Sequence, residues 1–293
     1  MGHPVRSLWR ALLCLALACS ALAAHAKLFL WEAEHDGQKV WLLGSVHVGR
    51  ADLYPLAEPI ESAYKQAGTL AVEADVTDVA SVAALVPMTA LPPEQTVPQL
   101  LNAKQNKQLD RTLKRLGLSH AVADHLKPWF LAITLSALEM RQQGFDADAG
   151  IDLHYLTAAK AEGKQVVQLE SAESQFKVLD SLSTEDSIAL LDSSIAPTAE
   201  HNFKHQFDRM IKAWKTGDTV AMRKIIDEDS GHDAASRRVN DKLFTERNRT
   251  MAEKIAALAD THAPLVVVGA GHLAGPGSII DLLRARGFRV TQQ

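Results

Sequence analysis

Two apolar segments that each end in Gly-x-x-His constrain the fold of this 293-residue chain. The first, VWLLGSVHVG, runs from residue 40 to 49 and contains His47, and the second, LVVVGAGH, runs from residue 265 to 272 and ends at His272. A short apolar run that meets a glycine is typical of a buried strand with a sharp turn after it. Because ligand sites of an open α/β sheet lie beyond the carboxyl ends of its strands, both histidines are candidates for one site.

Each of these histidines has two interpretations. Taken alone, His47 or His272 fits an ordinary loop residue. Taken together, two neutral imidazoles that follow strands in the same sequence context fit the beginning of a metal site. Both interpretations stay open at this level.

The N-terminal part of the chain predicts a strand pair, a helix and a third strand. Residues 28–46 predict a β-hairpin, since two apolar runs flank Asp36 and Gly37, a preferred pair for a type I′ turn. Residues 52–67 carry apolar side chains at helical spacing, and residues 68–76 predict the third strand.

The middle of the chain is predicted to be mostly helical, and strands return at the C-terminal end. A helix, a short turn and an apolar strand in succession favour a parallel α/β arrangement. We therefore expect a mixed α/β (α+β) fold with a central sheet built from both terminal regions. We expect a single domain over residues 27–293, with a helical insert over roughly residues 96–228. The predicted elements here are helices at 96–115, 121–143 and 150–163, a strand at 165–170, several helices within 172–228, and a strand, a helix and a strand after residue 264.

Residues 1–26 have the composition of a secretory signal peptide. Arg6 and Arg10 precede a short apolar segment that ends in the Ala-x-Ala of Ala24–Ala26, so cleavage is expected after Ala26. The predicted location is the periplasm or the cell exterior, with no transmembrane span after cleavage. A lipoprotein signal using Cys19 is the alternative, which the very short apolar segment before Cys19 disfavours.

Cleavage at that point removes both cysteines, Cys14 and Cys19. The mature chain then has no thiol, which excludes a cysteine nucleophile, a disulfide frame and a thiolate metal site. It keeps 29 Lys+Arg and 35 Asp+Glu, for a formal charge of −6. Since no basic cluster marks a nucleic-acid surface, we expect a peptide or small-molecule substrate and no nucleic-acid partner.

The predicted third strand contains the acidic residues of LAVEADV. Glu73 lies deep in an apolar run, where an unpaired carboxylate is costly, so it requires a partner. That partner is a cation, a metal, or a proton held by a raised pKa. A structural Arg–Glu pair is one alternative, and a general base or metal ligand is the other. Asp75, nearer the strand end, fits a loop cap or a group that supports the site.

Three further polar residues are candidates for the same site. Asp152 lies at a predicted helix start, where an aspartate is often only an N-terminal cap. Arg247 and Asn248, in FTERNRTMAEK, fall on a predicted helix with charged neighbours. The ordinary interpretation of such a pattern is a helix face exposed to solvent. The arginine also fits the stabilisation of an oxyanion or the anchoring of a carboxylate.

One helix carries a second histidine pattern. His201, His205 and Asp208 lie at i, i+4 and i+7 and share one helix face. The spacing can bind a metal, but the segment lacks the glutamate of the His-Glu-x-x-His zinc motif. We favour a solvated or partner-facing surface. The chain also lacks a Gly-x-Ser-x-Gly nucleophile elbow, a P-loop and a dinucleotide fingerprint after a strand.

The order of several segments resembles the TraB/PrgY/GumN family along nearly the whole mature chain. The segments are LLGSVHVG, LAVEAD, KPWF, GIDLHYLTAAKAEGKQVVQLES, ERNRTMAEKI and VVVGAGHLAGPGSIIDLLRARGFRV. The resemblance implies two similar α/β halves whose Gly-x-x-His loops meet at one site. It also implies a relation to the Tiki metalloproteases, which use a divalent cation such as manganese or cobalt, and to erythromycin-esterase-like and haem-handling proteins.

The resemblance assigns positions residue by residue. His47 and His272 match the two motif histidines, and Glu73 matches the acidic residue of the strand after the first motif. The Gly-Ile-Asp position corresponds to Asp152. The remaining pair, Arg-Asn on the helix before the second motif, corresponds to Arg247 and Asn248.

These observations lead to one main hypothesis and two alternatives. The main hypothesis is a periplasmic or secreted metal-dependent hydrolase of peptide bonds, in which His47, His272 and Glu73 bind Mn²⁺ or Co²⁺ in preference to Zn²⁺. Glu73 is ligand or general base for a water whose pKa the cation lowers, and Arg247 stabilises the oxyanion or holds a substrate carboxylate. The alternatives are a metal-independent esterase or lactone hydrolase that uses histidine and Glu73, and a non-catalytic binder of peptide, metal or haem.

Overall fold

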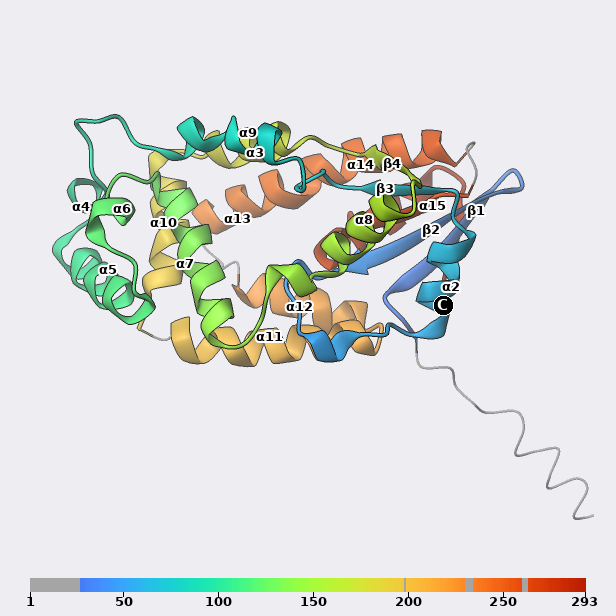
Figure 1. The fold of residues 1–293 in the computed structure, drawn as a ribbon, viewed down its shortest axis with the longest axis horizontal. Coiled ribbons are helices and arrows are strands. Elements are labelled where there is room, and N and C mark those ends of the chain that lie inside the picture. The colour runs from blue at the N-terminus through green and yellow to red at the C-terminus, as the bar shows by residue number, and fades with distance from the viewer. Residues whose placement is uncertain (1–26, 198, 230–233, 260–262) are drawn as a thin grey trace, which may run out of the picture.

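The computed structural model describes residues 27–197, 199–229, 234–259 and 263–293 (Figure 1). The signal peptide predicted for residues 1–26 lies outside the described residues. Within these ranges, no helix combines the length and the apolar character that crossing a membrane requires.

A six-stranded sheet in the order β4-β3-β5-β2-β1-β6 organises the molecule. The four strands β4, β3, β5 and β2 run parallel, whereas β1 runs antiparallel to both β2 and β6. The predicted mixed α/β fold with a sheet built from both terminal regions is therefore confirmed. The strands are β1 (Leu30–His35), β2 (Gln38–Ser45), β3 (Thr69–Val72), β4 (Gln165–Gln168), β5 (Leu265–Gly269) and β6 (Arg289–Gln292).

The predicted hairpin joins β1 to β2. Asp36 and Gly37 form its turn with φ angles of 49° and 80°, the left-handed values that a type I′ turn requires at both central residues. Aspartate tolerates this conformation and glycine adopts it without steric cost. Because the turn sets the register, Leu30 pairs with Leu43 and His35 with Gln38.

The third strand is shorter than predicted. It ends at Val72, so Glu73 and Asp75 follow the strand instead of lying within it. Asp75 accepts hydrogen bonds from the main-chain N–H and the hydroxyl of Thr77, which makes it the loop cap that the sequence analysis considered. The apolar run continues past the strand because Ala74 is buried in a small third cluster with Leu85 and Ala172.

Two helices predicted as continuous are each divided. The segment 96–115 becomes two helices because Asn102 caps the second one, accepting from the N–H of Lys104 and Gln105. The segment 121–143 is divided at Pro128, which occupies the first position of α7, where a proline needs no N–H partner.

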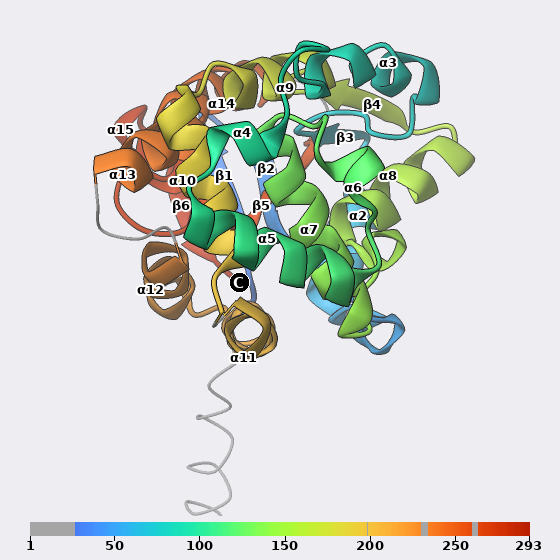
Figure 2. The same cartoon turned by 90° about the vertical axis from the view of Figure 1, so that its left-hand side faces the viewer.

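The helices surround the sheet and extend beyond one end of it (Figures 1 and 2). The α-helices are α2 (Glu58–Gln66), α3 (Val79–Ala83), α4 (Val97–Leu100), α5 (Ala103–Leu116), α6 (His120–Ala123), α7 (Pro128–Gln142), α8 (Ile151–Ala161), α9 (Ala172–Asp180), α10 (Thr184–Ile195), α11 (Ala199–Lys215), α12 (Thr219–Asp229), α13 (Ala234–Asn240), α14 (Glu246–Leu258) and α15 (Ile279–Ala285). Short 3₁₀ turns are η1 (Ala51–Leu53), η2 (Val86–Thr89), η3 (Ala147–Ala149) and η5 (Ala270–Leu273), and η4 (Asp241–Thr245) is a π-helical turn.

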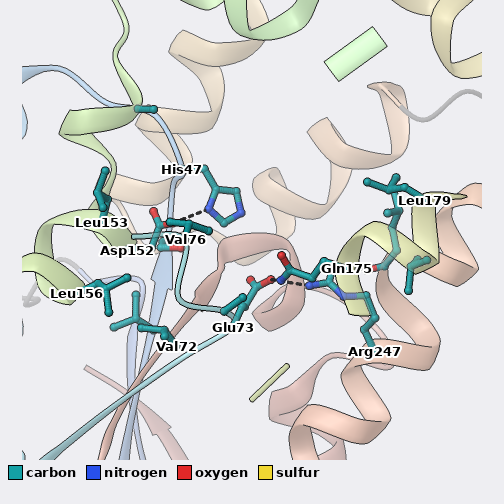
Figure 3. Close-up of a pocket in the computed structure, with 16 residues that line it drawn as sticks. His47, Val72, Glu73, Val76, Asp152, Leu153, Leu156, Gln175, Leu179 and Arg247 are labelled. Atoms are coloured by element: carbon teal, nitrogen blue, oxygen red, sulfur yellow. Dashed lines mark hydrogen bonds and ion pairs between the residues drawn. The ribbon is translucent and has the colours of Figure 1, made fainter. Parts of the chain in front are cut away.

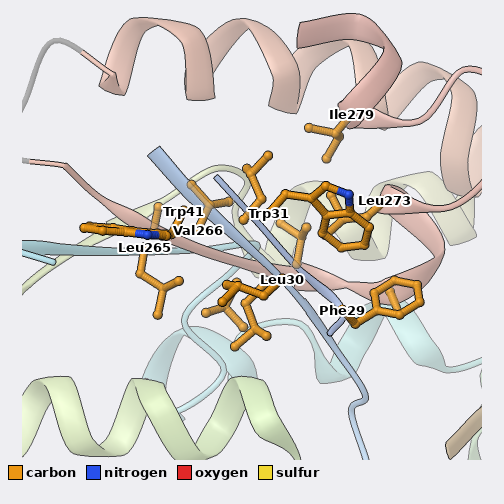
Figure 4. Packing of buried hydrophobic residues seen from close by; sticks show 14 of the residues in the cluster. Phe29, Leu30, Trp31, Trp41, Leu265, Val266, Leu273 and Ile279 are labelled. Carbon is orange, nitrogen blue, oxygen red and sulfur yellow. The ribbon is translucent and has the colours of Figure 1, made fainter. Parts of the chain in front are cut away.

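The described residues form two large hydrophobic clusters. The sheet cluster includes both faces of the strands, with α2 and α8 contributing on one side and α14 and α15 on the other (Figure 4). Strands β3 and β5 are buried along their whole length, as expected of parallel strands covered on both faces. The helical cluster lies within α4, α5, α7 and α10 and has its own core. The sheet cluster is therefore the part that positions the strand ends.

Candidate functional site

The predicted site residues meet at the carboxyl ends of three neighbouring strands. His47 follows β2, Glu73 follows β3, and His272 lies in η5 directly after β5. Strands β2 and β5 pair in parallel with Ser45 opposite Gly269, so the two Gly-x-x-His segments leave the sheet side by side. The sheet order places β5 between β2 and β3, which brings Glu73 to the same edge.

His47 is held by Asp152. The Nδ1 of His47 lies 3.0 Å from Oδ2 of Asp152, and 64% of the histidine side chain is exposed to the pocket opening. Asp152 lies in the first turn of α8 but caps no N–H group of the helix, so the expectation of a simple N-terminal cap is wrong. The pocket around His47 removes part of its hydration, which opposes protonation, but the hydrogen bond and charge of Asp152 and the charge of Glu73 raise its pKa to about 9.

His272 is held by Asn248. Its Nδ1 lies 2.6 Å from Oδ1 of Asn248, whose amide nitrogen donates to the carbonyl of Gly277 at 2.9 Å. Because that amide nitrogen donates to Gly277, the oxygen of Asn248 faces His272, so Nδ1 carries the proton and Nε2 keeps its lone pair. Burial lowers the pKa of His272 to about 4, so the ring is neutral at pH 7. The expectation that Asn248 belongs to a solvated helix face is wrong, because it is buried.

Glu73 has a partner on every side of its carboxylate. Oε1 accepts from the N–H of Gly269 at 2.7 Å, and Oε2 accepts from Arg247 at 2.6 Å and from Gln175 at 3.1 Å. Oε1 also lies 3.7 Å from Nε2 of His272. Burial alone would raise the pKa of Glu73, but the positive charges of the site and the Gly269 N–H lower it to about 2. Of the predicted partners, a cation is present, since Glu73 forms an ion pair with Arg247.

Arg247 joins Glu73 to a second acid that the sequence analysis did not identify. Its Nη2 lies 2.6 Å from Oε2 of Glu170, and Nε also donates to that carboxylate. Only 13% of the Arg247 side chain is exposed, so the reading of a solvated helix face is wrong here too. Glu170 lies two residues after β4, and an acid at the end of an apolar run was the available signal, as it was for Glu73.

Gln175 was also missed by the sequence analysis. It lies on α9 and its Nε2 is 3.1 Å from Oε2 of Glu73 and 3.3 Å from Oε2 of Glu170. Nothing in its local sequence distinguishes it from other helical glutamines, since its role depends on where α9 packs.

Gly269 leaves the space in which the site residues converge. A Cβ atom added at Gly269 would lie 3.3 Å from Oε1 of Glu73, 3.3 Å from Nε2 of His47 and 3.6 Å from Cδ2 of His272. The free Nε2 of His47 and the carboxylate of Glu73 are therefore both directed at one small volume beside the His272 ring. A side chain at this position would crowd that volume, which accounts for the glycine.

A pocket of about 380 Å³ opens over these residues (Figure 3). Its polar part comes from the strand ends and from the first turns of helices, and its walls come from α8, α9 and η4. The lining residues are Ser45, His47, Val72, Glu73, Ala74, Val76, Ala147, Asp152, Leu153, Leu156, Gln175, Val178, Leu179, Leu243, Arg247 and Val267. Of the predicted site residues, Asn248 and His272 lie behind this lining.

The donor atoms determine whether a cation fits here. In the ranges that the structure describes, no group of three or more His, Cys, Asp or Glu side chains is arranged to hold a metal ion. The donor types nevertheless fit a divalent first-row cation, since two imidazole Nε2 atoms and one carboxylate face the same space. The contact of each Nδ1 with an oxygen of Asp152 or Asn248 is also the usual support of a metal-binding histidine.

The second histidine pattern lies away from this pocket. His201, His205 and Asp208 belong to α11, and His205 and Asp208 are exposed. The side chain of His201 lies outside the described residues. Neither His205 nor Asp208 lines the pocket over β2, β3 and β5, so the interpretation as a surface feature stays in place for these two side chains.

Sequence comparisons connect the chain to proteins of bacteria and animals. It is 29% identical over 243 residues to the uncharacterized protein YbaP of Escherichia coli K12, which covers 83% of this chain and 87% of YbaP. It is 22% identical over 280 residues to an uncharacterized protein of Treponema pallidum, covering 92% and 84% of the two chains.

A more distant match is the metalloprotease TIKI2 of Xenopus tropicalis, at 21% identity over 314 residues. That match covers 89% of this chain and 59% of TIKI2. No solved structure matches the chain significantly.

The sequence profile of one family matches residues 29–292, which includes every strand and helix of the described structure. That range contains both Gly-x-x-His segments and all of the residues that meet at the strand ends. This chain belongs to the TraB/PrgY/gumN family.

Proposed function

We propose that this protein is a metal-dependent hydrolase that cleaves peptide bonds in the pocket over β2, β3 and β5. The observation that carries the proposal is the convergence of His47, His272 and Glu73 around Gly269. The name of the distant relative TIKI2, a metalloprotease, supports the same reaction class. The family and this relationship support a hydrolase in general, and the peptide bond and the metal are our proposal.

Charge balance supports a divalent cation in this site. Glu73, Asp152 and Glu170 bring three negative charges into the site, and Arg247 brings one positive charge. A cation bound at Nε2 of His47 would displace the proton that this ring holds at pH 7. With both imidazoles then neutral, two negative charges are left uncompensated in a largely buried region. A divalent cation would neutralise them.

Each residue of the chain has a defined part in this proposal. A divalent cation supplies Lewis-acid polarisation of a carbonyl and lowers the pKa of a water molecule. His47, His272 and Glu73 would hold it, while Asp152 and Asn248 orient the two imidazoles. The carboxylate of Glu73 is fixed by the Gly269 N–H and by Arg247 and lies beside both imidazoles, so we assign it the role of ligand.

Arg247 is better suited to positioning than to oxyanion binding. It donates to Glu73, to Glu170 and to the carbonyl of Leu243, which engages most of its N–H groups. We propose that it fixes the orientation of the Glu73 carboxylate. Mn²⁺ or Co²⁺ in preference to Zn²⁺, and a periplasmic or secreted location, remain part of the proposal.

Peptide cleavage tests the proposed function. The chain from Lys27 onward, purified without chelator, would be loaded with Mn²⁺, Co²⁺ or Zn²⁺ and incubated with a peptide library, with products identified by mass spectrometry. We expect discrete cleavage that chelation stops, that added metal restores, and that the double variant His47→Ala/His272→Ala lacks. Uncut peptides under all three metals, or equal cleavage by the double variant, would contradict the proposal.

A matched control separates the site from histidine loss in general. His120 lies 2.9 Å from Asp124 in the same kind of His–Asp contact, but on the surface of the helical part. His120→Ala is expected to cleave like the wild type. Cleavage of esters or lactones that survives chelation and needs His47 would instead favour the metal-independent hydrolase. Saturable binding without any product would favour the binding protein.

A further inference from the structure

Part of the pocket wall is aliphatic and lies outside the hydrophobic clusters of the described residues. Four wall residues are aliphatic and only partly buried: Leu153, Val178, Leu179 and Leu243. None of the four belongs to, or packs against, the three hydrophobic clusters of the described residues. Val76, at the pocket as well, is 50% exposed. A side chain of this type in contact with water gains free energy when another apolar group covers it.

The wall helices share one arrangement. Gln175 of α9 points to Glu73, and Val178 and Leu179 follow it at i+3 and i+4 on the same helix face. On α8, Asp152 contacts His47, and Leu156 lies one turn further on the same face. Each helix therefore presents a polar group to the strand ends and an aliphatic group one turn away.

The aliphatic residues lie on both sides of the polar centre. Figure 3 shows Leu153 and Leu156 on one side of His47 and Glu73, and Leu179 on the other. An occupant with a polar centre and apolar flanks matches this distribution. The volume of about 380 Å³ lies within the range of small-ligand sites.

The polar atoms of the pocket indicate how the centre of such an occupant is bound. The hydroxyl of Ser45 and Oδ1 of Asp152 are buried in the pocket region without a hydrogen-bond partner. Ser45 itself is only 2% exposed, and a polar group of an occupant beside it would satisfy its hydroxyl. A peptide main chain supplies both N–H and C=O groups.

The charged groups of the lining do not favour a charged side chain in the occupant. The charged lining residues are His47, Glu73, Asp152 and Arg247, and each of them already contacts another residue of the site. A carboxylate or ammonium placed against the aliphatic wall would lose its hydration without gaining a partner.

We propose that the pocket recognises a peptide through an aliphatic side chain, such as leucine, next to the bond that is cleaved. Val178, Leu179 and Leu243 form the specificity wall that receives this side chain. Ser45 and Asp152 bind the neighbouring main chain. The proposal rests on the proposed function in one respect, that the occupant is a peptide.

A peptide panel tests this specificity in two independent ways. The probes are blocked tetrapeptides, acetyl-Ala-Ala-Xaa-Ala-amide, in which Xaa is leucine, aspartate or lysine. Binding is measured by ligand-observed NMR with chelator present, and cleavage rates are measured on the metal-loaded protein. We expect the leucine peptide to bind, and to be cut, at least about tenfold better than the other two.

The two measurements separate the two proposals. Preferential binding of the leucine peptide without cleavage of any peptide would sustain the specificity wall and refute the hydrolase. Cleavage without any preference for leucine would support the hydrolase and refute the specificity wall. Equal or undetectable binding of the leucine and aspartate peptides would overturn the specificity wall.

A charge introduced in the wall should change the preference. Leu179→Lys is expected to abolish the preference for leucine and to favour the aspartate peptide, because the ammonium then offers it a partner. Val220→Lys, at a residue that is 78% exposed and is not among the lining residues, is the control and should keep the wild-type preference. An unchanged preference in folded Leu179→Lys, with folding checked by circular dichroism, would contradict the assignment of the wall.

Discussion

His47 and His272 are held by different partners, and this gives two similar imidazoles different electrostatic surroundings. The carboxylate of Asp152 favours a positive charge on His47, whereas burial, with the charge of Arg247, keeps His272 neutral. Both contacts engage Nδ1 and leave Nε2 directed toward the space beside Gly269. At the scale of residues, the orientation of each imidazole is therefore fixed by the neighbour that contacts its Nδ1 atom.

Removing the partner of His272 should weaken cation binding more than folding. Asn248→Ala lets the ring rotate, and we expect the affinity for Mn²⁺ to fall by about 10- to 100-fold, the usual cost of losing such a support. Isothermal titration calorimetry would measure this. Asn106→Ala is the control. Like Asn248, Asn106 donates from its side-chain amide to the main chain, in its case to two carbonyls, but it lies in the helical part. Equal Mn²⁺ affinity in wild type and Asn248→Ala would contradict the assignment.

Arg247 should contribute strongly to stability. Arg247→Met leaves Glu73 and Glu170, which are 11% and 9% exposed, without their shared cation. We expect the free energy of unfolding to fall by about 3–5 kcal/mol, the range for breaking a buried pair. Urea unfolding would measure it. Arg289→Met removes an ion pair with Glu34 on the surface and should change the unfolding free energy little. A similar small effect for both variants would refute this role.

At the scale of elements, the turns that follow the strands determine where the site side chains lie. The parallel pairing of β2 and β5 places Ser45 opposite Gly269, and a short 3₁₀ turn then presents His272. The glycine at the end of β5 has φ and ψ of −50° and 135°, which other residues adopt freely. A glycine is needed here because it has no side chain, since a Cβ atom would lie close to Glu73 and His47.

This distinction between two uses of glycine is testable. Gly269→Ala should fold with nearly wild-type stability but bind Mn²⁺ much more weakly, because its methyl group fills the convergence point. Gly37→Ala should do the opposite, losing about 1 kcal/mol of stability from its positive φ while binding Mn²⁺ normally. Thermal unfolding and calorimetry on both variants would decide. Unchanged Mn²⁺ affinity in Gly269→Ala would contradict the geometry of the site.

The sequence predicted those elements whose signals are local. The hairpin was found from Asp36 and Gly37, and the strand-end histidines from glycine after an apolar run. The third strand was predicted too long because the run LAVEA stays partly buried after Val72, where the backbone has already left the sheet. The spacing of apolar residues indicates which side chains are buried, but it does not indicate where the hydrogen bonds between strands end.

The site residues that were found have a local sequence signal, whereas those that were missed depend on how distant elements pack. Glu73 required a partner because it follows an apolar run, but the sequence could not choose between metal and arginine. Gln175 and Glu170 gain their roles only when α9 and β4 pack beside β3. Asp152, Arg247 and Asn248 were named through the family resemblance, whereas pattern alone favoured a cap and a solvated face.

At the scale of the whole molecule, the site belongs to the sheet cluster while the helical cluster forms a separate core. Figures 1 and 2 show α5, α7 and α10 together beyond the sheet. The specificity wall lies where the helical region meets the sheet, on α9 and η4. A substitution within the helical cluster should therefore lower the free energy of unfolding without changing the arrangement of the strand-end residues.

A cavity in the helical cluster tests this separation. Leu131 is fully buried there, and Leu131→Ala should lower the free energy of unfolding by about 2–5 kcal/mol. The folded variant should still bind Mn²⁺ with wild-type affinity, because its strand ends are supported by the other cluster. Urea unfolding and calorimetry on the same sample would show whether both statements hold. Loss of Mn²⁺ binding in the folded variant would contradict the separation.

The central claim is that the strand-end residues form a cation site, and metal content tests it most directly. The chain from Lys27 onward and its double variant His47→Ala/His272→Ala would be incubated with Mn²⁺, Co²⁺ and Zn²⁺, freed of excess metal and measured by plasma mass spectrometry. The account predicts close to one metal ion per wild-type chain and none in the double variant. Wild-type protein without metal, or equal metal in both proteins, would contradict it.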